Sequence, residues 1–516
     1  MVARITTLAF QGIDAVKVDV QVHLSPGKMV FNMVGLPDKA VAESRERVRS
    51  ALAAIGLGLP PERITVNLAP ADLPKEGSHY DLPIALGLMV AMGAIEAATL
   101  EDFVAMGELS LDGRLSPVPG VLPAAVAAMT WGRGLICPQA NGREAYWSGL
   151  TRPDKKGVIA GENLLQIVNH LKGTQLLPAP EAEVAHERDG LPDLRDIRGQ
   201  EEARLALEVA AAGGHNLLMS GPPGAGKSML AARLPGILPP LEPAERLETS
   251  MIASLSGRVF QADNMPAALI AERPFRAPHH SASMAALIGG GRQALPGEIS
   301  LAHNGVLFLD ELPEFSRQTL DALRQPIETG RVEVARAAAH VTYPARFQLI
   351  AAMNPCRCGH ANDPQLACNR LPHCMQEYLG KLSGPLLDRF DIRISVPAVK
   401  LEEMIAPQSG EDSATVSARV LAARKIQWAR NEGVLNAHLD GERLYELSKP
   451  EPAGQKLLES TVEKKGLTAR GFNRILRVTR TLADLAGVDT PQKAHVASAL
   501  IWRGLADFTG QSRKSK

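Results

Sequence analysis

Residues 216–228 read NLLMSGPPGAGKS, and this stretch decides the fold of the middle of the chain. A short apolar strand leads into the pattern G-x-x-x-x-G-K-S, and the helix-like sequence MLAARL follows. In that order, the loop turns its backbone N–H groups around phosphate oxygens, and the N-terminus of the helix adds positive potential. The pattern therefore predicts a nucleotide-binding loop formed by Gly221, Pro222, Pro223, Gly224, Ala225, Gly226, Lys227 and Ser228.

Two side chains of this loop have specific expected roles. Lys227 is expected to reach the β- and γ-phosphates of ATP, and Ser228 to hold Mg²⁺. Residues 305–311, GVLFLDE, supply the second half of such a site, because this apolar strand ends in two carboxylates. Asp310 suits Mg²⁺ binding through water, and Glu311 suits polarisation of the attacking water. An acidic pair at a strand end is often only a surface turn, but together with a phosphate loop it predicts ATP hydrolysis.

The segment between the two motifs is unusually long. Lys227 and Asp310 are 83 residues apart, which is more than one helix–strand crossover needs. Residues 273–291, RPFRAPHHSASMAALIGGG, fit an inserted loop. Functional loops are commonly basic and glycine-rich, and a plain connector is an equal alternative.

The flanking sequence divides the chain into further parts. At 516 residues, about three or four domains are expected. Residues 1–172 alternate β-like runs with helical stretches, which indicates an α/β fold, and residues 173–192 have the polar, Pro-rich composition of a linker. A second α/β part covers 193–400. After a break at 401–414, residues 415–516 are strongly helical.

Charge and composition exclude several classes of protein. The chain has 56 Lys+Arg against 56 Asp+Glu, so it is not a polybasic coat for nucleic acid. Residues 417–516 nevertheless hold 18 Lys+Arg against 10 Asp+Glu, which places a basic excess in the helical tail. Aromatic residues make up only 4%, which disfavours a stacking platform for single strands.

Targeting signals and cysteine usage indicate the compartment. The N-terminus lacks the apolar segment of roughly 7–15 residues that a signal peptide contains. The longest apolar run, residues 84–95, is too short to span a bilayer and predicts a buried helix. Five cysteines do not make a secreted disulfide framework. These features predict a cytoplasmic protein that has no membrane partner.

Several stretches together resemble the YifB/ComM family of magnesium-chelatase-like AAA+ ATPases, and the resemblance extends over nearly the whole chain. They are DIRGQEEARLALEVAAAGGHNLLMSGPPGAGKS (196–228), FRAPHHSAS (275–283), GVLFLDELPEF (305–315), AAMNPCRCG (351–359) and SGPLLDRFDI (383–392). The resemblance implies a Lon-protease-like (ribosomal S5 domain 2-like) N-terminal domain, a P-loop AAA+ α/β core and a C-terminal helical lid. It also implies a homo-hexameric ring.

The resemblance assigns further roles in the nucleotide site. Asn354 matches the sensor-1 position and would position the attacking water or the γ-phosphate. Arg389 matches the arginine finger, which acts on the nucleotide of a neighbouring subunit; arginine suits this role because it is permanently charged and forked. Arg470 matches the sensor-2 arginine of the lid, with Arg474 as a rival one turn further on. For each arginine, a surface salt bridge is the alternative.

A predicted hairpin points to the substrate of the ring. Residues 329–336, TGRVEVAR, alternate as one arm of a β-hairpin does. The arm is similar to the pre-sensor hairpin of MCM-type helicases, whose tip carries a basic residue into the pore. Arg336, with Arg331 nearby, is then expected to contact DNA phosphate, and a solvated hairpin is the alternative. The family resemblance implies a motor for branch migration of recombination intermediates in natural transformation, with branched or single-stranded DNA and recombination proteins as partners.

The Lon-like domain departs from a working protease. A Lon-type protease needs a serine nucleophile and a lysine base within reach of each other. Residues 106–115, MGELSLDGRL, are similar to the core of that fold, and PKEGSHYD (74–81) lies where the nucleophile loop belongs. The serine position there falls on His79, with Ser78 one place away, and Leu122 stands where the lysine belongs. We therefore expect this domain to support ring assembly or DNA contact and not to cleave peptides.

Four cysteines lie within 19 positions of one another: Cys356, Cys358, Cys368 and Cys374. Zn²⁺ prefers four such thiolates in a tetrahedron, and a cytosolic chain has little use for disulfides. The cluster predicts a structural zinc site, with His360 and His373 as substitute ligands and reduced, unliganded thiols as the alternative. A bound zinc ion would fix the loop that follows Asn354.

Three functions remain open from the sequence. The leading one is an ATP- and Mg²⁺-dependent hexameric motor on DNA. The second is a magnesium-chelatase-type ATPase that remodels a protein partner; it would share the AAA+ core but has no evident need for a Lon-like domain. The third is a protease with an ATP-driven unfoldase, which the missing lysine at Leu122 disfavours.

Overall fold

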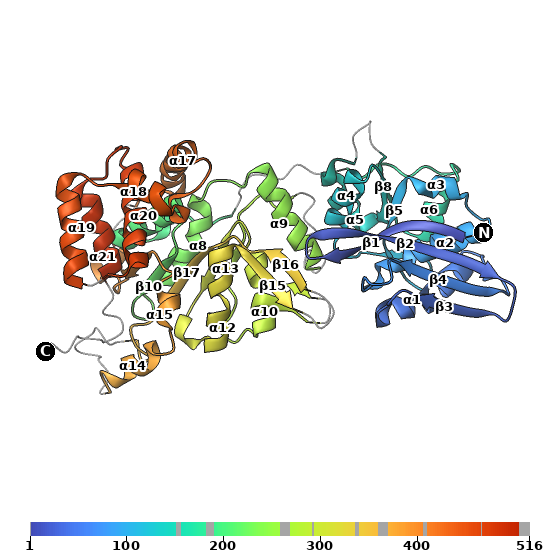
Figure 1. Ribbon diagram of the computed structural model, residues 1–516, viewed down its shortest axis with the longest axis horizontal. Helices are drawn as coiled ribbons and strands as arrows, with labels where there is room; N and C mark the ends of the chain where they lie inside the picture. The colour runs from blue at the N-terminus through green and yellow to red at the C-terminus, as the bar shows by residue number, and fades with distance from the viewer. Residues whose placement is uncertain are drawn as a thin grey trace.

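Three parts of the chain lie in a row along the long axis of the molecule (Figure 1). The computed structural model describes residues 2–150, 156–181, 190–257, 269–291, 294–335, 340–359, 370–405, 410–465 and 467–504. An N-terminal α/β part forms one end, a second α/β part forms the middle, and the C-terminal helices form the other end. Within those ranges, no helix is both long and apolar enough to cross a membrane.

A mixed seven-stranded sheet forms the N-terminal part, in the order β3-β4-β2-β1-β5-β8-β9. The pairs β1–β2 and β2–β4 are antiparallel, and the other neighbours are parallel. Valines at alternate positions of β2 are fully buried, as expected where one face of a strand packs on helices. The strands are β1 (Val2–Gln11), β2 (Asp14–Ser25), β3 (Val30–Val34), β4 (Arg63–Ala69), β5 (Phe103–Ala105), β8 (Gly134–Pro138) and β9 (Val158–Gly161).

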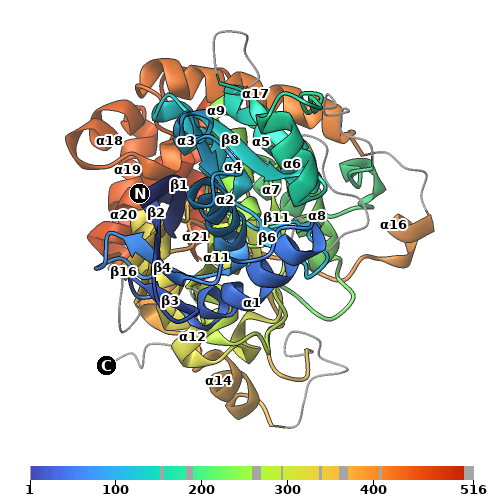
Figure 2. The same ribbon diagram turned by 90° about the vertical axis from the view of Figure 1, so that its right-hand side faces the viewer.

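Helix α2 (Asp81–Ala91) packs on β1 and β2 of this sheet, and α1 (Lys39–Ala54) packs on α2. Every residue of α2 up to Val90 is buried, which confirms the predicted buried helix. A short pair, β6 (Glu108–Leu109) and β7 (Leu115–Ser116), lies beside it. The other helices are α3 (Ala97–Glu101), α4 (Val121–Thr130), α5 (Gln139–Ala145) and α6 (Leu164–Leu171). Figure 2 views the molecule from this end.

A five-stranded sheet in the order β11-β14-β17-β10-β18 forms the middle part, and all its neighbours are parallel. All residues of β10, β14 and β17 are buried, which explains why these strands read as continuous apolar runs. Parallel strands end at the same edge, so the loops that follow them meet there. The strands are β10 (Leu217–Ser220), β11 (Phe275–Arg276), β14 (Val306–Leu309), β17 (Gln348–Met353) and β18 (Ile392–Ser395).

The interpretation of residues 273–291 as an inserted loop is partly wrong. Two of its residues, Phe275 and Arg276, form β11, which pairs with β14 at the edge of the central sheet. A strand of two residues has no sequence periodicity to detect. The segment continues through α10 (Met284–Ile288) into β12 (Gly289–Gly290), which pairs with β13 (Leu295–Pro296).

Helices and one hairpin surround the central sheet. The predicted hairpin arm is confirmed, because β15 (Arg331–Ala335) pairs with the antiparallel strand β16 (His340–Pro344). The helices are α7 (Glu201–Gly213), α8 (Lys227–Ile237), α9 (Pro243–Leu255), α11 (Glu298–Leu301), α12 (Arg317–Ala322), α13 (Arg324–Thr329), α14 (His373–Leu379) and α15 (Gly384–Leu387).

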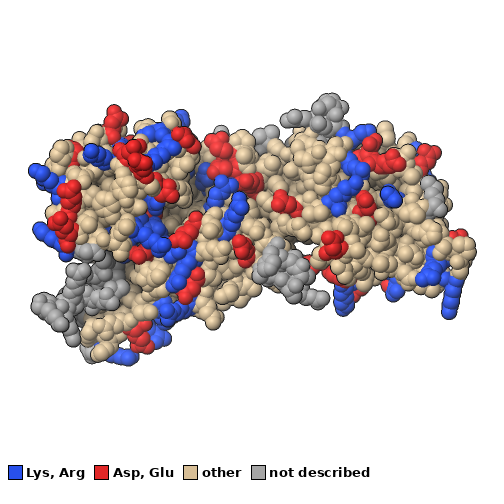
Figure 3. Space-filling view, viewed as in Figure 1, with Lys and Arg blue, Asp and Glu red and all other residues tan. Residues whose placement is uncertain are grey.

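The C-terminal helices pack against α7, α8 and the edge strand β18. They are α17 (Ser413–Arg430), α18 (Gly441–Ser448), α19 (Pro452–Lys465), α20 (Ala469–Leu485) and α21 (Lys493–Gly504). The break expected at 401–414 begins instead with a helix, α16 (Leu401–Ile405), which projects from the body (Figure 2). Basic side chains of the tail are partly internal, because Arg424, Arg480 and Arg503 are buried. On the face shown in Figure 3, acidic and basic side chains are interspersed over the C-terminal helices.

The N-terminal part is seated on the middle part at two places. At the β1–β2 turn, a Cβ atom on Gly12 would lie 2.5 Å from the carbonyl oxygen of Thr342 in β16. Phe10 and Ile13 beside this turn pack against the apolar cluster of the middle part. The second place is α4, which packs on α9. A cavity of 280 Å³ lies between the two parts.

The fold thus has a mixed α/β character with a parallel central sheet and a helical C-terminal part, as predicted at that level. The Lon-like character of the first part stays a prediction. The loops after β10, β14 and β17 meet at the carboxyl edge of the central sheet, so this edge is the place where the fold positions a candidate site.

Candidate active site

The phosphate loop lies between β10 and α8 at the carboxyl edge of the central sheet. Gly224 and Gly226 both have positive φ, 77° and 86°, a conformation that favours glycine because it has no Cβ. Helix α8 starts directly at Lys227, so its N-terminal N–H groups face the same loop. The loop therefore has the backbone shape and the positive potential that an anionic ligand needs.

Lys227 joins the loop to the neighbouring strand end. Its buried ammonium group donates to the carbonyl oxygens of Gly221 (2.8 Å) and Pro222 (2.9 Å) and to Oδ1 of Asn354 (3.2 Å). Burial lowers the pKa of Lys227, whereas the charges of Asp310 and Glu311 oppose that shift. Three sequence-predicted residues, Lys227, Asp310 and Asn354, are thus brought to one place by three different loops.

The two carboxylates after β14 point to different partners. Oδ2 of Asp310 accepts a hydrogen bond of 2.7 Å from the Ser228 hydroxyl. Hydroxyl and carboxylate oxygens are the ligands that Mg²⁺ prefers, so this pair fits the ion. Glu311 is exposed and has a φ of 50°, a strained conformation for a residue with a side chain. Such strain is commonly found where the surrounding structure holds a functional residue in place.

A cavity of 430 Å³ adjoins the phosphate loop and was not predicted from the sequence. It is lined by residues 197–202, Arg204, Ser395 at the end of β18 and the segment that follows, including Pro397. Gln200 closes one side, because its amide donates to the carbonyl oxygens of Ala225 (3.4 Å) and Pro397 (2.6 Å). This volume suits a small ligand such as a nucleoside. The only sequence signal was that DIRGQ belongs to the stretch resembling the family.

Three predicted arginines lie at the opposite edge of the sheet. Arg389, Arg470 and Arg474 line one cavity of 360 Å³ close to the beginning of β18. Arg389 is buried and donates to the carbonyl oxygen of Pro385 (2.7 Å), and it pairs with Glu328 at 2.6 Å. Arg474 pairs with the buried Asp391, whereas Arg470 is exposed. The alternative for Arg389 was a surface salt bridge. Arg389 does form an ion pair, with Glu328, but its guanidinium is buried.

The β15–β16 hairpin places its two basic residues differently. Arg331 is exposed and pairs in register with Pro344, at the end of the hairpin far from its turn. Val332 and Val334 on the other face are buried in the apolar cluster of the middle part. Arg336 lies outside the described residues. Arg331 therefore lies away from the turn of the hairpin. Its position does not support the idea that both arginines act together at a hairpin tip.

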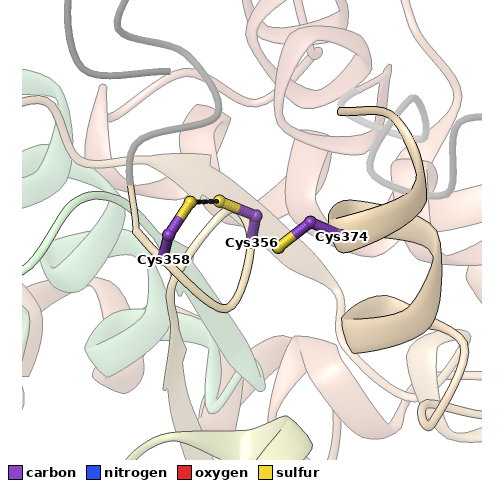
Figure 4. Close-up of side chains that lie close together, drawn as sticks. All are labelled: Cys356, Cys358 and Cys374. Carbon is purple, nitrogen blue, oxygen red and sulfur yellow. Dashed lines mark hydrogen bonds between the residues drawn. The ribbon is translucent and has the colours of Figure 1, made fainter. Parts of the chain in front are cut away.

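Three of the four predicted zinc ligands converge. The sulfur atoms of Cys356, Cys358 and Cys374 all lie within 4.8 Å of one another, and those of Cys356 and Cys358 are 3.0 Å apart (Figure 4). Cys356 and Cys358 come from the loop after β17, and Cys374 comes from α14. Cys368 and His360 lie outside the described residues. His373, although next to Cys374, is not part of the convergent group.

Three magnesium-chelatase family profiles match successive parts of the chain. The profile described as magnesium chelatase, subunit ChlI, matches residues 193–404. The profile of subunit ChlI of Mg-chelatase matches 20–141, and the profile of the ChlI C-terminal part matches 410–503.

Two complete proteins are similar over nearly their whole length. The uncharacterised protein YifB of Salmonella typhimurium is 45% identical over 98% of this chain and 97% of its own. The competence protein ComM of Haemophilus influenzae is 46% identical over 96% of both. The chain belongs to the YifB/ComM family of magnesium-chelatase-like proteins. A more distant relative, the magnesium-chelatase 38 kDa subunit of Rhodobacter capsulatus, is 25% identical over 61% of this chain and 87% of its own.

Membership of the YifB/ComM family agrees with the geometry at the carboxyl edge and indicates an ATPase that uses ATP and Mg²⁺. In the N-terminal part, the Ser78 hydroxyl donates to the Glu108 carboxylate, and the buried Lys75 ammonium donates to the carbonyl oxygen of Pro70. Burial lowers the pKa of His79 to about 4, and Nε2 of its ring contacts the Leu8 carbonyl oxygen. Ser78, Lys75 and His79 thus each have a partner of their own, Leu122 still stands where the protease lysine is expected, and the absence of peptide cleavage by this YifB/ComM-type domain stays a prediction.

Sequence reasoning missed His280 in this YifB/ComM-family site. Nδ1 of His280 lies 3.3 Å from Oε2 of Glu311, and its ring lies 4.0 Å from that of His279, centroid to centroid. The reason for the contact is topological: β11, which leads into the two histidines, is the sheet neighbour of β14, which leads into Glu311. The motif FRAPHHSAS was visible, but nothing in the sequence indicates that its segment flanks the acidic pair.

Replacing His280 with alanine is expected to lower kcat for ATP hydrolysis about tenfold while leaving KM for ATP unchanged. The physical reason is that a Glu311 carboxylate without this partner would sample more orientations, and orientation contributes strongly to rate. The matched control is His279→Ala, because the ring of His279 contacts the Ser281 hydroxyl at 2.7 Å instead of Glu311. Equal kcat values for the two variants would show that His280 does not position Glu311.

Proposed function

We propose that the chain is an ATP-dependent motor that forms a hexameric ring and promotes branch migration of recombination intermediates, as in natural transformation. The observation that carries the ring is the separation of the phosphate loop from Arg389. The loop follows the carboxyl end of β10, whereas Arg389 precedes the amino end of its neighbour β18. Four strand residues at about 3.3 Å each separate the two edges, so Arg389 lies roughly 13 Å from its own phosphate loop, beyond the reach of its side chain.

A ring resolves this separation. One subunit would offer Lys227, Ser228, Asp310 and Glu311 at one edge of its sheet, and the neighbouring subunit would offer its arginines from the other edge. Such head-to-tail contacts close into a ring when the rotation between subunits permits. Arg389, Arg470 and Arg474 line one cavity, and this shared position supports the proposal of a single intersubunit site.

In the proposed reaction, the cavity beside Gln200 holds the adenosine moiety, and the phosphate loop holds the phosphates. Lys227 exchanges its hydrogen bonds to backbone carbonyl oxygens for the β- and γ-phosphates. Ser228 and Asp310 would hold Mg²⁺, which neutralises phosphate charge when it is bound. Glu311 orients the attacking water and accepts its proton, and Asn354 keeps the γ-phosphate aligned through its contact with Lys227. Arg389 of the neighbouring subunit stabilises the charge of the transition state.

The DNA part of the proposal has two supports. One is the hairpin β15–β16, whose β15 arm leads directly into Arg336. The other is the name of the Haemophilus influenzae relative, a competence protein, which is similar over 96% of both chains. Basic loops inside a ring gain affinity from phosphate charge and release counterions on binding. The binding of DNA should therefore weaken steeply with salt.

The deciding experiment measures ATP hydrolysis with and without DNA, and movement of a fluorescent four-way junction. We expect single-stranded or branched DNA to raise the rate of ATP hydrolysis several-fold, with a stimulation that falls as salt rises. Arg336→Ala should reduce this stimulation, and Arg331→Ala, at the far end of the same strand, is the matched control. A wild-type protein that hydrolyses ATP but neither responds to DNA nor moves the junction contradicts the motor.

The same measurements test the alternative function. The similarity to the Rhodobacter capsulatus magnesium-chelatase 38 kDa subunit favours an ATPase that remodels a protein partner. For such an enzyme, ATP hydrolysis would be indifferent to every DNA tested. DNA-dependent hydrolysis separates the two functions without knowledge of the partner.

A further inference from the structure

We infer that Cys356, Cys358 and Cys374 bind a zinc ion that holds the γ-phosphate end of the nucleotide site in shape. The three thiols come from two separate segments, yet their sulfur atoms converge within 4.8 Å. Zinc–sulfur bonds of about 2.3 Å place tetrahedral sulfur ligands about 3.8 Å apart, so one ion fits among these three atoms. Each thiol would lose its proton on binding.

The burial of the three cysteines favours a structural ion. Cys356 is fully buried, Cys374 is half-buried and Cys358 is exposed, so the site has an inner and an outer side (Figure 4). The backbone between the first two is closed by a hydrogen bond of 2.9 Å from the N–H of Gly359 to the carbonyl oxygen of Cys356. In this tight turn the sulfur atoms of Cys356 and Cys358 point toward each other, and the Cys374 side chain projects from α14 toward them (Figure 4).

Two contacts connect this cluster to the nucleotide site. A Cβ atom on Gly359 would lie 2.5 Å from Cδ of Pro223, so the turn that carries Cys356 and Cys358 rests on the phosphate loop. The second contact comes from α14, one turn after Cys374: the buried Tyr378 hydroxyl lies beside the backbone of Asn354, which opposes the rise in the pKa of Tyr378. Burial raises the pKa of Tyr378 to about 12, so this hydroxyl stays protonated at neutral pH.

These contacts mean that a zinc ion here would act as a clamp, which we define as a link that holds α14 against the end of β17. Cys356 follows Asn354 by two residues, and Asn354 is also held from α14 through Tyr378. A zinc ion between Cys356 and Cys374 would therefore fix the distance between α14 and the end of β17. Without the ion, Asn354 would be held less firmly, and the turn would rest less firmly on Pro223. Nucleotide affinity should then fall.

The first measurement is the zinc content of the full-length protein without nucleotide. We expect about one zinc per chain, released to a chromogenic chelator when the thiols are modified. Cys358→Ser should lose the ion, Cys374→His should retain part of it because imidazole also binds zinc, and Cys137→Ala in the N-terminal part should keep it fully. Zinc no higher in wild type than in Cys358→Ser, with Cys358 freely reactive in the wild type, would overturn the site.

The second measurement tests the clamp, and it rests on the proposed nucleotide site. Binding of a fluorescent ADP analogue should weaken about fivefold or more in Cys358→Ser and in wild type stripped of zinc, and should recover when zinc is added back to the stripped protein. The add-back guards against a variant that simply fails to fold. Equal affinity with and without zinc would overturn the clamp. A protein that carries zinc but binds no nucleotide would instead contradict the proposed function.

Discussion

The Glu311→Gln variant is expected to hydrolyse ATP about 10²–10⁴-fold more slowly than the wild type, because glutamine cannot accept the proton of the attacking water. Binding of ATP should persist, because Lys227, Ser228 and Asp310 are untouched and the hydrogen bonds of their side chains do not involve the Glu311 side chain. Rates from a coupled ATPase assay, beside equilibrium binding of an ATP analogue, give both quantities. Junction movement should stop with hydrolysis.

The matched control for this variant is Glu314→Gln. Glu314 lies three residues further on, beside the same site, and pairs with Lys381 at 3.3 Å. The same loss of charge at this position should change hydrolysis little, because the group pairs with a lysine and not with the phosphate loop. If both variants hydrolyse ATP at the wild-type rate, Glu311 is not the base and another group must activate the water.

The Arg389→Ala variant should lose about 10³–10⁵-fold in hydrolysis rate while its own phosphate loop still binds ATP. The guanidinium would be missing from a neighbour's site, so a defect in one chain appears in another. Glu328, the ion-pair partner, is half exposed and is expected to tolerate the loss, because water can solvate its carboxylate once the guanidinium is removed. Arg317→Ala, at an exposed arginine on α12, is the matched control.

Mixing two inactive variants gives the sharper test of this arrangement. Lys227→Ala removes the phosphate contact, and Arg389→Ala removes the arginine. In a mixed ring, a site can combine an intact Lys227 from one chain with an intact Arg389 from the next. Hydrolysis should therefore reappear on mixing, although each variant alone is inactive. A mixture that stays inactive, in rings shown by light scattering to contain both chains, would mean that Arg389 acts within its own chain.

Local motifs carried most of the prediction of the nucleotide site. The phosphate loop and the acidic pair are continuous stretches whose chemistry follows from the order of residues, and the burial of β10, β14 and β17 follows from their apolar runs. His280 and the cavity beside Gln200 could not be predicted in this way. Their positions depend on which strands become neighbours, and a two-residue strand such as β11 leaves no pattern in the sequence.

The basic tail shows a different limit of sequence reasoning. Its excess of Lys and Arg suggests positive charge available to DNA, yet several of these arginines are buried and bind partners inside the protein. Arg424 donates to the carbonyl oxygen of Ala211, Arg480 pairs with Asp484, and Arg503 donates to the carbonyl oxygen of Phe390. A count of charged residues does not distinguish a guanidinium that binds a partner inside the protein from one that faces solvent. The hairpin is therefore the better candidate for DNA contact than the tail as a whole.

The seating of Gly12 against Thr342 means that the hairpin β15–β16 cannot swing alone. If the hairpin moves, the β1–β2 turn has to move with it, or the turn has to shift its packing on the apolar cluster that Phe10 and Ile13 contact. In a working ring, the N-terminal domains would then rock in turn with the hairpins and would not form a static collar. Removing the N-terminal domains would release the hairpins, but it would also expose the apolar surface that Phe10 and Ile13 contact. The remaining ATPase part should therefore aggregate.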